Sequence, residues 1–416
     1  QFVPGVMGAA LTFDPTRPVL DEDSPFGGYF QWDDPLAVNN PVSSLALTDD
    51  SGQALRTLNS AGFTYELPFI KGLSINSDVS YDYIKGTKTR IEDPLLKDNE
   101  SFNRGGFIFD EEFRNLTSQV ETYATYNRDL SLRDSRVSLT AGHSWLETDQ
   151  ENRWEEGREL EFNGDDVTPT VDIKRDSFLT ANRLISFFGR ANFTIFEKYL
   201  LTASLRADGS SRFGDANKWG YFPSGAIAWR VLQEDWAKGL SSKFSDLKLR
   251  LSYGGVGNQD LDGDFLYKTF YSLSTQDAAY QFGDEYIQTL RGVGVDPSIR
   301  WESTYSLNFG IDFGISNNRY SGTLDIYEQN TNDLLFRVAA PAFTNLADRI
   351  LTNIGEMRNR GVELTLSTVP VDKDKWKLKI DFNASYNNNE ILKLDNSENN
   401  EDFAGYEDGG ISGDIG

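Results

Sequence analysis

The sequence predicts an all-β chain that forms a transmembrane antiparallel β-barrel, with short periplasmic turns and long extracellular loops. Three observations support this fold class. Several stretches alternate strictly between apolar and polar residues, aromatic residues make up 13% of the 416 residues, and no apolar run is long enough for a spanning helix. Successive side chains of a strand point to opposite faces, so each alternating stretch has one apolar and one polar face.

The composition excludes several kinds of function. The chain has no cysteine and a single histidine, so disulfide scaffolds, thiolate metal sites and histidine-based catalytic triads are excluded. Its 64 acidic and 40 basic residues give a net charge of −24, which argues against binding nucleic acid. His143 shares the apolar register of Leu139 and Trp145, and an interfacial position explains it better than a ligand role.

The elements follow in chain order. Residues 1–61 lack sustained alternation, and we expect an extracellular loop region there. Residues 62–393 are expected to form part of a barrel, and residues 394–416 a truncated extracellular loop. The alternation is clearest over residues 73–83, 199–208, 247–253, 301–313 and 376–386.

The connections between these strands alternate between short and long. Short ones are expected at residues 70–72, 128–132, 196–198, 316–318 and 370–375, and a medium one at 232–245. Long polar ones are expected at 86–112, 150–182, 209–218, 256–300, 337–356 and from 393 onward. About twelve strands running up and down, with tight turns at one end only, are typical of outer-membrane barrels.

Aromatic residues cluster at both ends of the expected strands, as in the girdles of membrane barrels. Those beside the short turns are Phe69, Phe196, Tyr199, Trp229, Phe313, Tyr320 and Trp376. Those at the other ends are Tyr81, Tyr83, Trp145, Tyr253, Trp301 and Tyr386. A soluble sandwich or propeller is the alternative, but the strands are too long for it, and their polar faces carry Arg, Lys and Asp at mid-strand, which a hydrated lumen accepts.

Specific segments resemble SusC-like TonB-dependent transporters, the RagA/SusC family. They are YLLTASLRADGSSRFGDANKWGYFPSGAIAWRV (residues 199–231), LKLRLSYGGVGNQ (247–259), residues 296–335, NIGEMRNRGVELTLS (353–367) and AALTFDPTRPV (9–19). The resemblance implies an outer-membrane barrel of about 22 strands. The plug, the TonB box and the first strands would precede residue 1, and the last strands would follow residue 416.

The resemblance also implies partners and a location. A SusC-like barrel works with a SusD-like surface lipoprotein and takes energy from the TonB–ExbB–ExbD complex. It lies in the outer membrane of a Gram-negative bacterium and imports oligosaccharides or oligopeptides. The alternatives are a non-transporting extracellular adhesion or glycan-binding protein and an outer-membrane enzyme; the second lacks a nucleophile–base pair, so we expect no enzyme.

Candidate site residues lie in the expected outer loops. Trp154, Tyr280, Phe282 and Tyr286 could stack on sugar rings or a partner, although such residues also pack within loops. Arg212 and Phe213 lie in the loop after residue 208, where an architectural role is the alternative to ligand contact. No cofactor is expected, apart from calcium on the alternating carboxylates of Asp260, Asp262 and Asp264, for which a solvated turn is the competing interpretation.

The strand carboxylates allow two interpretations. Glu302, Asp312, Asp325, Glu363 and Asp381 could form acid pairs for glycoside hydrolysis. They lie on polar strand faces, however, and we expect them to line a hydrated lumen and pair with the nearby basic residues Lys248, Arg250, Lys377 and Lys379. The acidic excess in the outer loops favours neutral or basic cargo.

Overall fold

The structure is a computed structural model. It describes residues 5–34, 37–97, 104–132, 134–163, 166–261, 263–273, 279–292, 294–339 and 349–394. Helices are short: α1 (Val6–Thr12), α2 (Pro41–Ala46) and the 3₁₀ segments η1 (Val231–Gln233) and η2 (Asp235–Ser242). Within these ranges, no helix combines the length and apolar character needed to cross a membrane.

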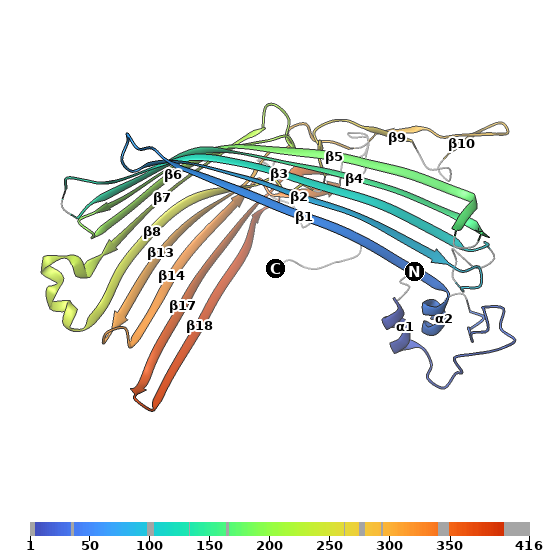
Figure 1. Ribbon diagram of the computed structural model, residues 1–416, viewed down its shortest axis with the longest axis horizontal. Coiled ribbons are helices and arrows are strands. Elements are labelled where there is room, and N and C mark those ends of the chain that lie inside the picture. The colour runs from blue at the N-terminus through green and yellow to red at the C-terminus, as the bar shows by residue number, and fades with distance from the viewer. Residues whose placement is uncertain are drawn as a thin grey trace. The chain divides into compact units, whose positions relative to one another are not determined.

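Twelve strands form one antiparallel sheet in which each strand lies beside its neighbours in the sequence (Figure 1). They are β1 (Thr48–Glu66), β2 (Leu73–Glu92), β3 (Phe107–Asp129), β4 (Arg136–Asn163), β5 (Asp166–Ile195), β6 (Tyr199–Ser210), β7 (Trp219–Arg230), β8 (Phe244–Asn258), β13 (Glu302–Ile315), β14 (Tyr320–Asn332), β17 (Glu356–Lys373) and β18 (Trp376–Lys393). The predicted all-β class with about twelve antiparallel strands is confirmed.

In the described part of the chain, three small two-stranded sheets lie outside this sheet. They pair β9 (Tyr271–Leu273) with β12 (Leu290–Gly292), β10 (Tyr280–Phe282) with β11 (Glu285–Ile287), and β15 (Leu335–Ala339) with β16 (Arg349–Asn353). All three belong to segments that join long strands at the end opposite the tight turns. The predicted alternation of short and long connections therefore holds from β6 to β18.

Strands β1 to β5 extend further than the sequence predicted. Residues 48–61 belong to β1 rather than to a loop region, and residues 150–182 belong almost entirely to β4 and β5. The loop expected at 86–112 shrinks to the segment between Glu92 and Phe107. These extensions are mostly polar and carry cross-strand ion pairs such as Arg175–Glu155, so apolar alternation could not reveal them.

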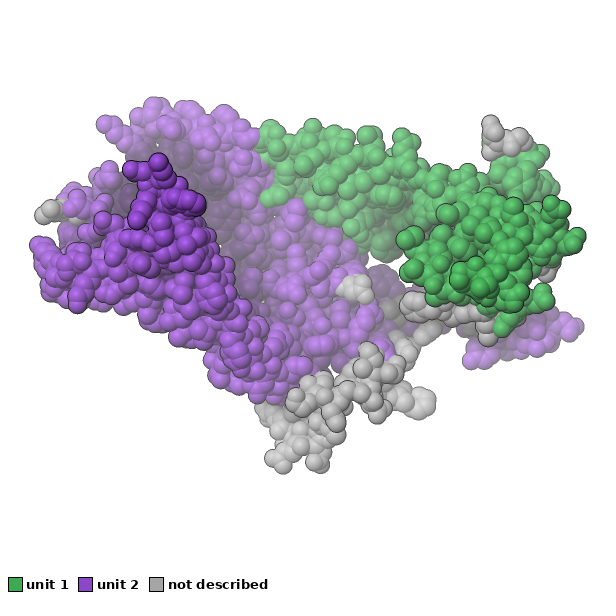
Figure 2. Space-filling model, turned by 90° about the horizontal axis from the view of Figure 1, so that it is seen from below, with its two compact units in different colours: residues 1–61, 79–119, 147–181 green, residues 62–78, 120–146, 182–416 purple. Residues whose placement is uncertain are grey.

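The chain divides into two compact units (Figure 2). Unit 1 comprises residues 1–61, 79–119 and 147–181, and unit 2 comprises residues 62–78, 120–146 and 182–416. Unit 1 therefore contains one part of each of β1 to β5, and unit 2 contains the other part together with all later strands.

The buried apolar core is small and lies in unit 2. It consists of Phe213, Phe222, Leu261, Ile299 and Trp301, which come from β7, from the connection before it and from the long connection between β8 and β13. The Trp301 ring lies 5.2 Å from that of Phe213 and 5.5 Å from that of Phe222. This cluster fixes the long connections to the end of the sheet, while most strand side chains remain accessible.

Candidate functional site

One face of the sheet in unit 2, called here the polar face, carries paired charges on β8, β13 and β14. Lys248 Nζ lies 2.5 Å from Asp312 Oδ2, and Arg250 Nη2 lies 2.8 Å from Asp312 Oδ1. The same Arg250 nitrogen lies 3.1 Å from Asp325 Oδ2. The four side chains are between 15% and 32% exposed, so they form a hydrated wall whose charges are neutralised.

Gly310 allows this network to cross three strands. It lies on β13 directly between Arg250 of β8 and Asp325 of β14. A Cβ atom at this position would lie 2.6 Å from the Arg250 guanidinium and 2.6 Å from Asp325 Oδ1. Because glycine has no side chain, the Arg250 guanidinium can pass over Gly310 and reach the Asp325 carboxylate.

A second charged group lies on the polar face of β5 and β6. Arg206 Nε donates to both carboxylate oxygens of Asp208, at 2.8 and 2.9 Å, and its Nη2 donates to Ser186 Oγ at 2.8 Å. Further along the sheet, Lys379 Nζ lies 3.1 Å from Asp381 Oδ2. The contacts of Asp312, Asp325 and Asp381 agree with the expected pairing of strand carboxylates with basic residues. Glu302 instead accepts hydrogen bonds from Asn258 Nδ2 and from the Leu335 N–H.

The opposite face, called here the apolar face, is exposed and carries large apolar side chains. Leu307 and Phe309 are 49% and 41% exposed. They lie on the odd-numbered register of β13, opposite to the register of Asp312 on the polar face, as the sequence predicted. Further exposed members in unit 2 are Phe187, Phe193, Leu205, Ile227, Leu251, Ile326, Val362, Ile380 and Phe382. Such a continuous apolar surface needs a covering, and a lipid bilayer provides one.

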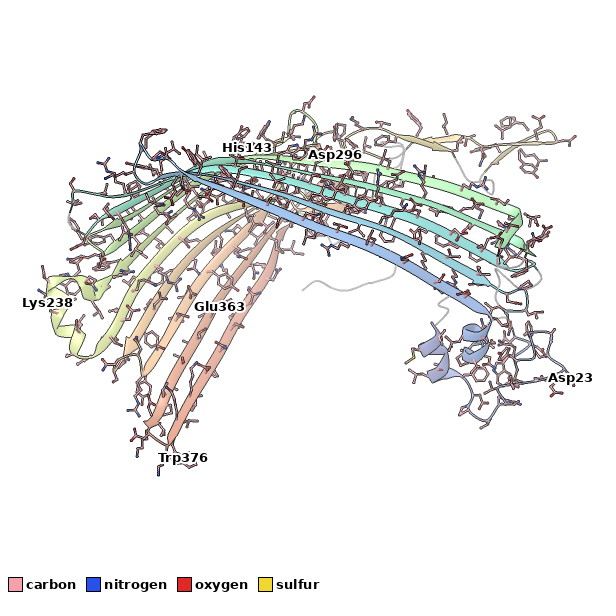
Figure 3. The ribbon with its side chains drawn as sticks, in the orientation of Figure 1. Asp23, His143, Lys238, Asp296, Glu363 and Trp376 are labelled. Atoms are coloured by element: carbon pink, nitrogen blue, oxygen red, sulfur yellow. The ribbon has the colours of Figure 1, made fainter. Side chains whose placement is uncertain are left out.

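Aromatic rings lie on the apolar face near the ends of its strands. The His143 ring lies 6.1 Å from that of Phe187, which lies 6.2 Å from that of Trp219. Figure 3 shows Trp376 at the turn between β17 and β18, where it is widely exposed. Trp301 differs from the expected girdle role: it is buried, and its Nε1 donates to the Lys218 carbonyl, because the long connections pack over it.

Arg212 and Phe213, which the sequence suggested as ligand contacts, have different surroundings in the structure. Phe213 is fully buried in the core cluster, so the expectation of ligand contact is corrected for this residue. Arg212 Nε donates to Asp264 Oδ1 at 2.9 Å, and its Nη1 lies 3.4 Å from Asp260 Oδ1. The guanidinium thus joins the loop after β6 to the connection after β8.

These contacts involve two of the three carboxylates proposed to hold calcium. Asp260 and Asp264 both face Arg212, whose positive charge competes with a cation, and Asp262 lies outside the described residues. Among the residues that the structure describes, no three acidic or histidine side chains gather as a metal site would require.

The remaining predicted aromatic residues are separated. Tyr280, Phe282 and Tyr286 lie on the exposed hairpin of β10 and β11, where Tyr286 is paired with Gln281. Tyr280 and Phe282 alternate with Gln281 and therefore share one face of the hairpin, while Tyr286 lies on the other. Trp154 lies in unit 1, in the groove described next.

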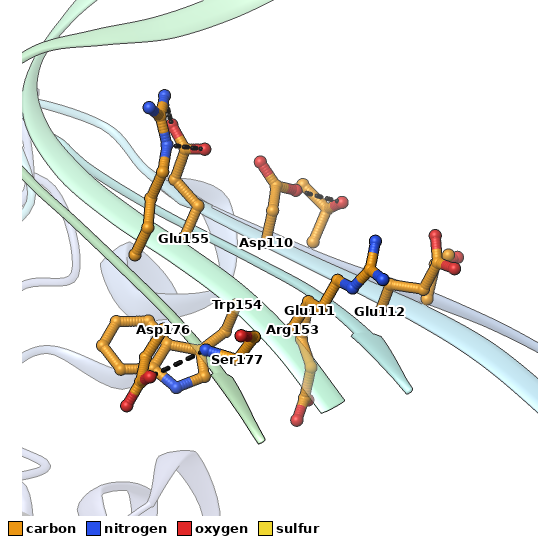
Figure 4. Close-up of a pocket in the computed structure, with 11 residues that line it drawn as sticks. Asp110, Glu111, Glu112, Arg153, Trp154, Glu155, Asp176 and Ser177 are labelled. Carbon is orange, nitrogen blue, oxygen red and sulfur yellow. Dashed lines mark hydrogen bonds and ion pairs between the residues drawn. The ribbon is translucent and has the colours of Figure 1, made fainter. Parts of the chain in front are cut away.

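A groove of about 650 Å³ lies across β2 to β5 in unit 1 (Figure 4). Its lining contains five carboxylates and two guanidinium groups besides Trp154, so it is acidic. The Trp154 ring lies parallel to that of Phe109, with the centroids 6.2 Å apart and the planes inclined by 25°. Next to it, Asn152 Nδ2 donates to Glu111 Oε1 at 2.6 Å.

The two registers of these strands bring different groups to the groove. Trp154 shares its register on β4 with Thr140 and Thr148, whose hydroxyls bond to Thr125 and Thr117 of β3. This is the register of the polar face, since alternate residues such as His143 belong to the apolar face.

Charged side chains occupy the other register in unit 1. Arg175 donates to Glu155 through Nε at 2.6 Å and through Nη2 at 2.9 Å. This bidentate hydrogen bonding holds the pKa of the Glu155 carboxyl below its usual range. Lys85 and Glu112 form a further pair at 3.0 Å, and the Lys85 ammonium lowers the pKa of that carboxyl through a hydrogen bond.

Sequence reasoning missed the role of Gly310 and the groove itself. A glycine within a strong alternating pattern signals a bulge or a close approach, and this signal could have identified Gly310. The groove offered no such signal, because its lining residues come from two segments, 86–112 and 150–182, that were expected to be loops.

The family model "TonB dependent receptor-like, beta-barrel" matches residues 8–413. TonB-dependent receptor SusC of Bacteroides thetaiotaomicron is 31% identical over 406 residues, covering 93% of this chain and 40% of SusC. TonB-dependent receptor P39 of Formosa agariphila is 30% identical, covering 90% of this chain and 34% of P39. The chain thus spans well under half the length of these curated relatives.

Solved structures agree on the fold. The solved structure of the RagAB peptide importer in the closed-closed state superimposes with a TM-score of 0.74 over 88% of this chain and 40% of that chain, at 22% identity. At this identity the likeness shows the fold alone.

Proposed function

The chain belongs to the TonB-dependent receptor β-barrel family, and from this premise we propose that it forms barrel wall in an outer-membrane importer of oligosaccharides. The importer acts with a SusD-like lipoprotein and is energised by TonB. Members of this family are transporters, so the chain is not an enzyme. In this proposal the apolar face contacts lipid and the polar face lines the hydrated interior.

The observation that carries the proposal is the match to SusC across nearly the whole chain. The faces of the sheet support a transport role. Mid-strand charges such as Arg250 and Asp312 are paired and hydrated on one face, while exposed Leu307 and Phe309 occupy the other. Such a division suits a wall between lipid and a water-filled path.

Trp154 supports sugars as the cargo. Its indole lies on the register of the polar face, beside the carboxylate and amide groups of Glu111 and Asn152. A flat aromatic surface next to hydrogen-bonding groups suits a sugar ring, which has apolar CH faces and a polar edge of hydroxyl groups.

A second cargo class, basic oligopeptides, is favoured by the charge of the same groove. Glu111 lies on the same register as Trp154 and adds a negative charge beside the indole, so this register attracts cationic ligands and repels anionic ones. A non-transporting adhesion protein is the third candidate, and it would bind cargo without taking it up.

Uptake by cells that express the full-length gene product tests the proposal. We expect accumulation of labelled neutral oligosaccharides that stops when TonB is deleted or the proton gradient is collapsed. Surface binding that persists without uptake would identify an adhesion protein, and accumulation of basic peptides instead of sugars would identify the second cargo.

Trp154 is tested in the same assay. Trp154→Ala should raise the KM for uptake several-fold, and Trp154→Phe, which keeps an aromatic ring, should restore most of the affinity. Equal KM values for both variants and the wild type would exclude cargo contact at this position.

A further inference from the structure

The connection from β7 to β8 differs from the other turns at its end of the sheet. It contains η1 and η2 instead of a tight turn. Val231 and Ala237 are buried and fix the connection to the protein, whereas the Trp236 side chain between them is 66% exposed. An indole held so open beside an apolar surface requires an explanation.

Glu234 holds the connection in a fixed orientation. Its Oε1 accepts hydrogen bonds from Tyr199 Oη at 2.5 Å and from Trp229 Nε1 at 3.2 Å, and its Oε2 lies 3.0 Å from Lys198 Nζ. Tyr199 and Trp229 are directly paired across β6 and β7. Both belong to the apolar register. Glu234 therefore accepts hydrogen bonds from the polar atoms of two rings that lie at the end of the apolar face.

Trp236 extends this aromatic group beyond the strands. Its ring lies 6.1 Å from that of Trp229, with the planes inclined by 55°. The polar side chains of the segment point elsewhere: Lys238 and Asp235 form an exposed ion pair at 2.7 Å. Lys238 is labelled at the tip of this connection in Figure 3. The apolar face is therefore continuous with Trp236 and ends in charged groups.

We propose that η2 is a membrane-interface anchor, in which Trp236 inserts beside Trp229 into the headgroup region of the inner, phospholipid leaflet of the outer membrane. Indole rings favour this region because one part of the ring is apolar and the N–H is polar. The exposed charges of Lys238 and Asp235 remain in water. The anchor rests on the outer-membrane location proposed above and is independent of the cargo.

Gly239 provides a probe that leaves every native side chain in place. In a 3₁₀ helix, residues three apart lie on the same side, so Gly239 lies on the side of Trp236. A Cβ atom at Gly239 would meet no other atom within 4 Å, and this chain has no cysteine of its own. Gly239→Cys can therefore carry a nitroxide spin label, and Lys238→Cys serves as the matched control.

The full-length protein, with any cysteine outside this chain replaced by serine, is reconstituted in phosphatidylethanolamine–phosphatidylglycerol vesicles. Relaxation of the label by oxygen, which partitions into lipid, is compared with relaxation by a water-soluble nickel chelate. We expect the oxygen-to-nickel ratio to be several-fold higher at position 239 than at 238. Equal ratios would place η2 in water, and a label shielded from both reagents would show a protein partner there; either result overturns the anchor.

A second measurement uses unlabelled protein. Trp236→Ser should lower the unfolding temperature more in vesicles than in detergent micelles, because the headgroup region of a bilayer is thicker and more ordered than that of a micelle. An equal decrease in both would indicate simple packing and contradict the anchor. Uptake measured in cells that express the same variants separates the two proposals, since loss of transport with an intact label pattern would count against the proposed function alone.

Discussion

Strands β4 and β5 pass through both units, and their shared register differs between the two. In unit 2 this register carries His143 and Phe187, with their rings in contact on the apolar face. In unit 1 the same register carries Glu155 and Arg175, which form a bidentate ion pair. The backbone pairing continues unchanged while the side chains change from apolar to charged. The surroundings of a strand, rather than its hydrogen bonding, therefore select the residues on its outer register.

The largest effect is expected when an arginine is introduced on the outer register of a strand in each unit. Leu251→Arg, on the apolar face of unit 2, should cost about 2–4 kcal/mol, because a guanidinium at bilayer depth is poorly solvated. Thr87→Arg, on the exposed outer register of unit 1, should change stability by no more than about 0.5 kcal/mol. Urea titration of folding into lipid vesicles measures both. Equal losses would contradict the assignment of the two environments.

The next test concerns the close approach at Gly310. Gly310→Ala should cost about 1–3 kcal/mol, because its Cβ would lie 2.6 Å from both Arg250 and Asp325 and force them apart. Gly225→Ala is the matched control, since the nearest atom, the Thr202 carbonyl oxygen, would lie 3.8 Å away. Thermal unfolding in micelles compares the two. An equal loss of stability in Gly225→Ala and Gly310→Ala would contradict the role of Gly310 in the contact between Arg250 and Asp325.

A smaller effect should separate the two carboxylates of the polar face. Asp312 contacts both Lys248 and Arg250, whereas Asp325 contacts Arg250 alone. Asp312→Asn should therefore cost about 1 kcal/mol and Asp325→Asn less, because hydrated ion pairs contribute modestly. Denaturant unfolding of the two variants provides the measurement, and the reverse order would show that the network depends mainly on the Arg250–Asp325 contact.

The smallest effect is expected in unit 1, at the exposed pair of Glu155 and Arg175. The hydrogen bonds from Arg175 lower the folded-state pKa of Glu155, so the pair stabilises the protein above the usual carboxyl pKa of about 4.5. This contribution is lost as the pH falls through the lowered folded-state pKa. The unfolding temperatures of the wild type and Glu155→Gln should therefore differ slightly near neutral pH and converge below pH 4.5. A difference that grows on acidification would mean that the pair does not stabilise the ionised carboxyl.

The same comparison explains which elements could be predicted. Residues 301–313 alternate because one side contacts apolar surroundings and the other water, and the structure places β13 there. Residues 150–182 are mostly charged or polar, so no sustained apolar pattern develops, and we expected a loop where β4 and β5 continue. Apolar periodicity detects the surroundings of a strand, not the strand itself.

The candidate site shows the same limit at single residues. Pairing of Asp312 and Asp325 with basic residues followed from their shared polar register. The burial of Phe213 and Trp301 did not, because it depends on long connections that fold back over the end of the sheet. Trp154 could be selected as an aromatic residue, but its parallel contact with Phe109 required the register of two extended strands.

The sequence by itself determined the fold class and the two faces of the sheet, since these depend on local alternation with a period of two. The direction of most strands followed from the alternation of short and long connections. It also carried the family resemblance, because ordered motifs survive in the linear chain. Only the tertiary structure decided how far β1 to β5 extend, which loop residues are buried and where Gly310 lets Arg250 reach Asp325. These features depend on contacts between residues distant in sequence, and no local pattern records such contacts.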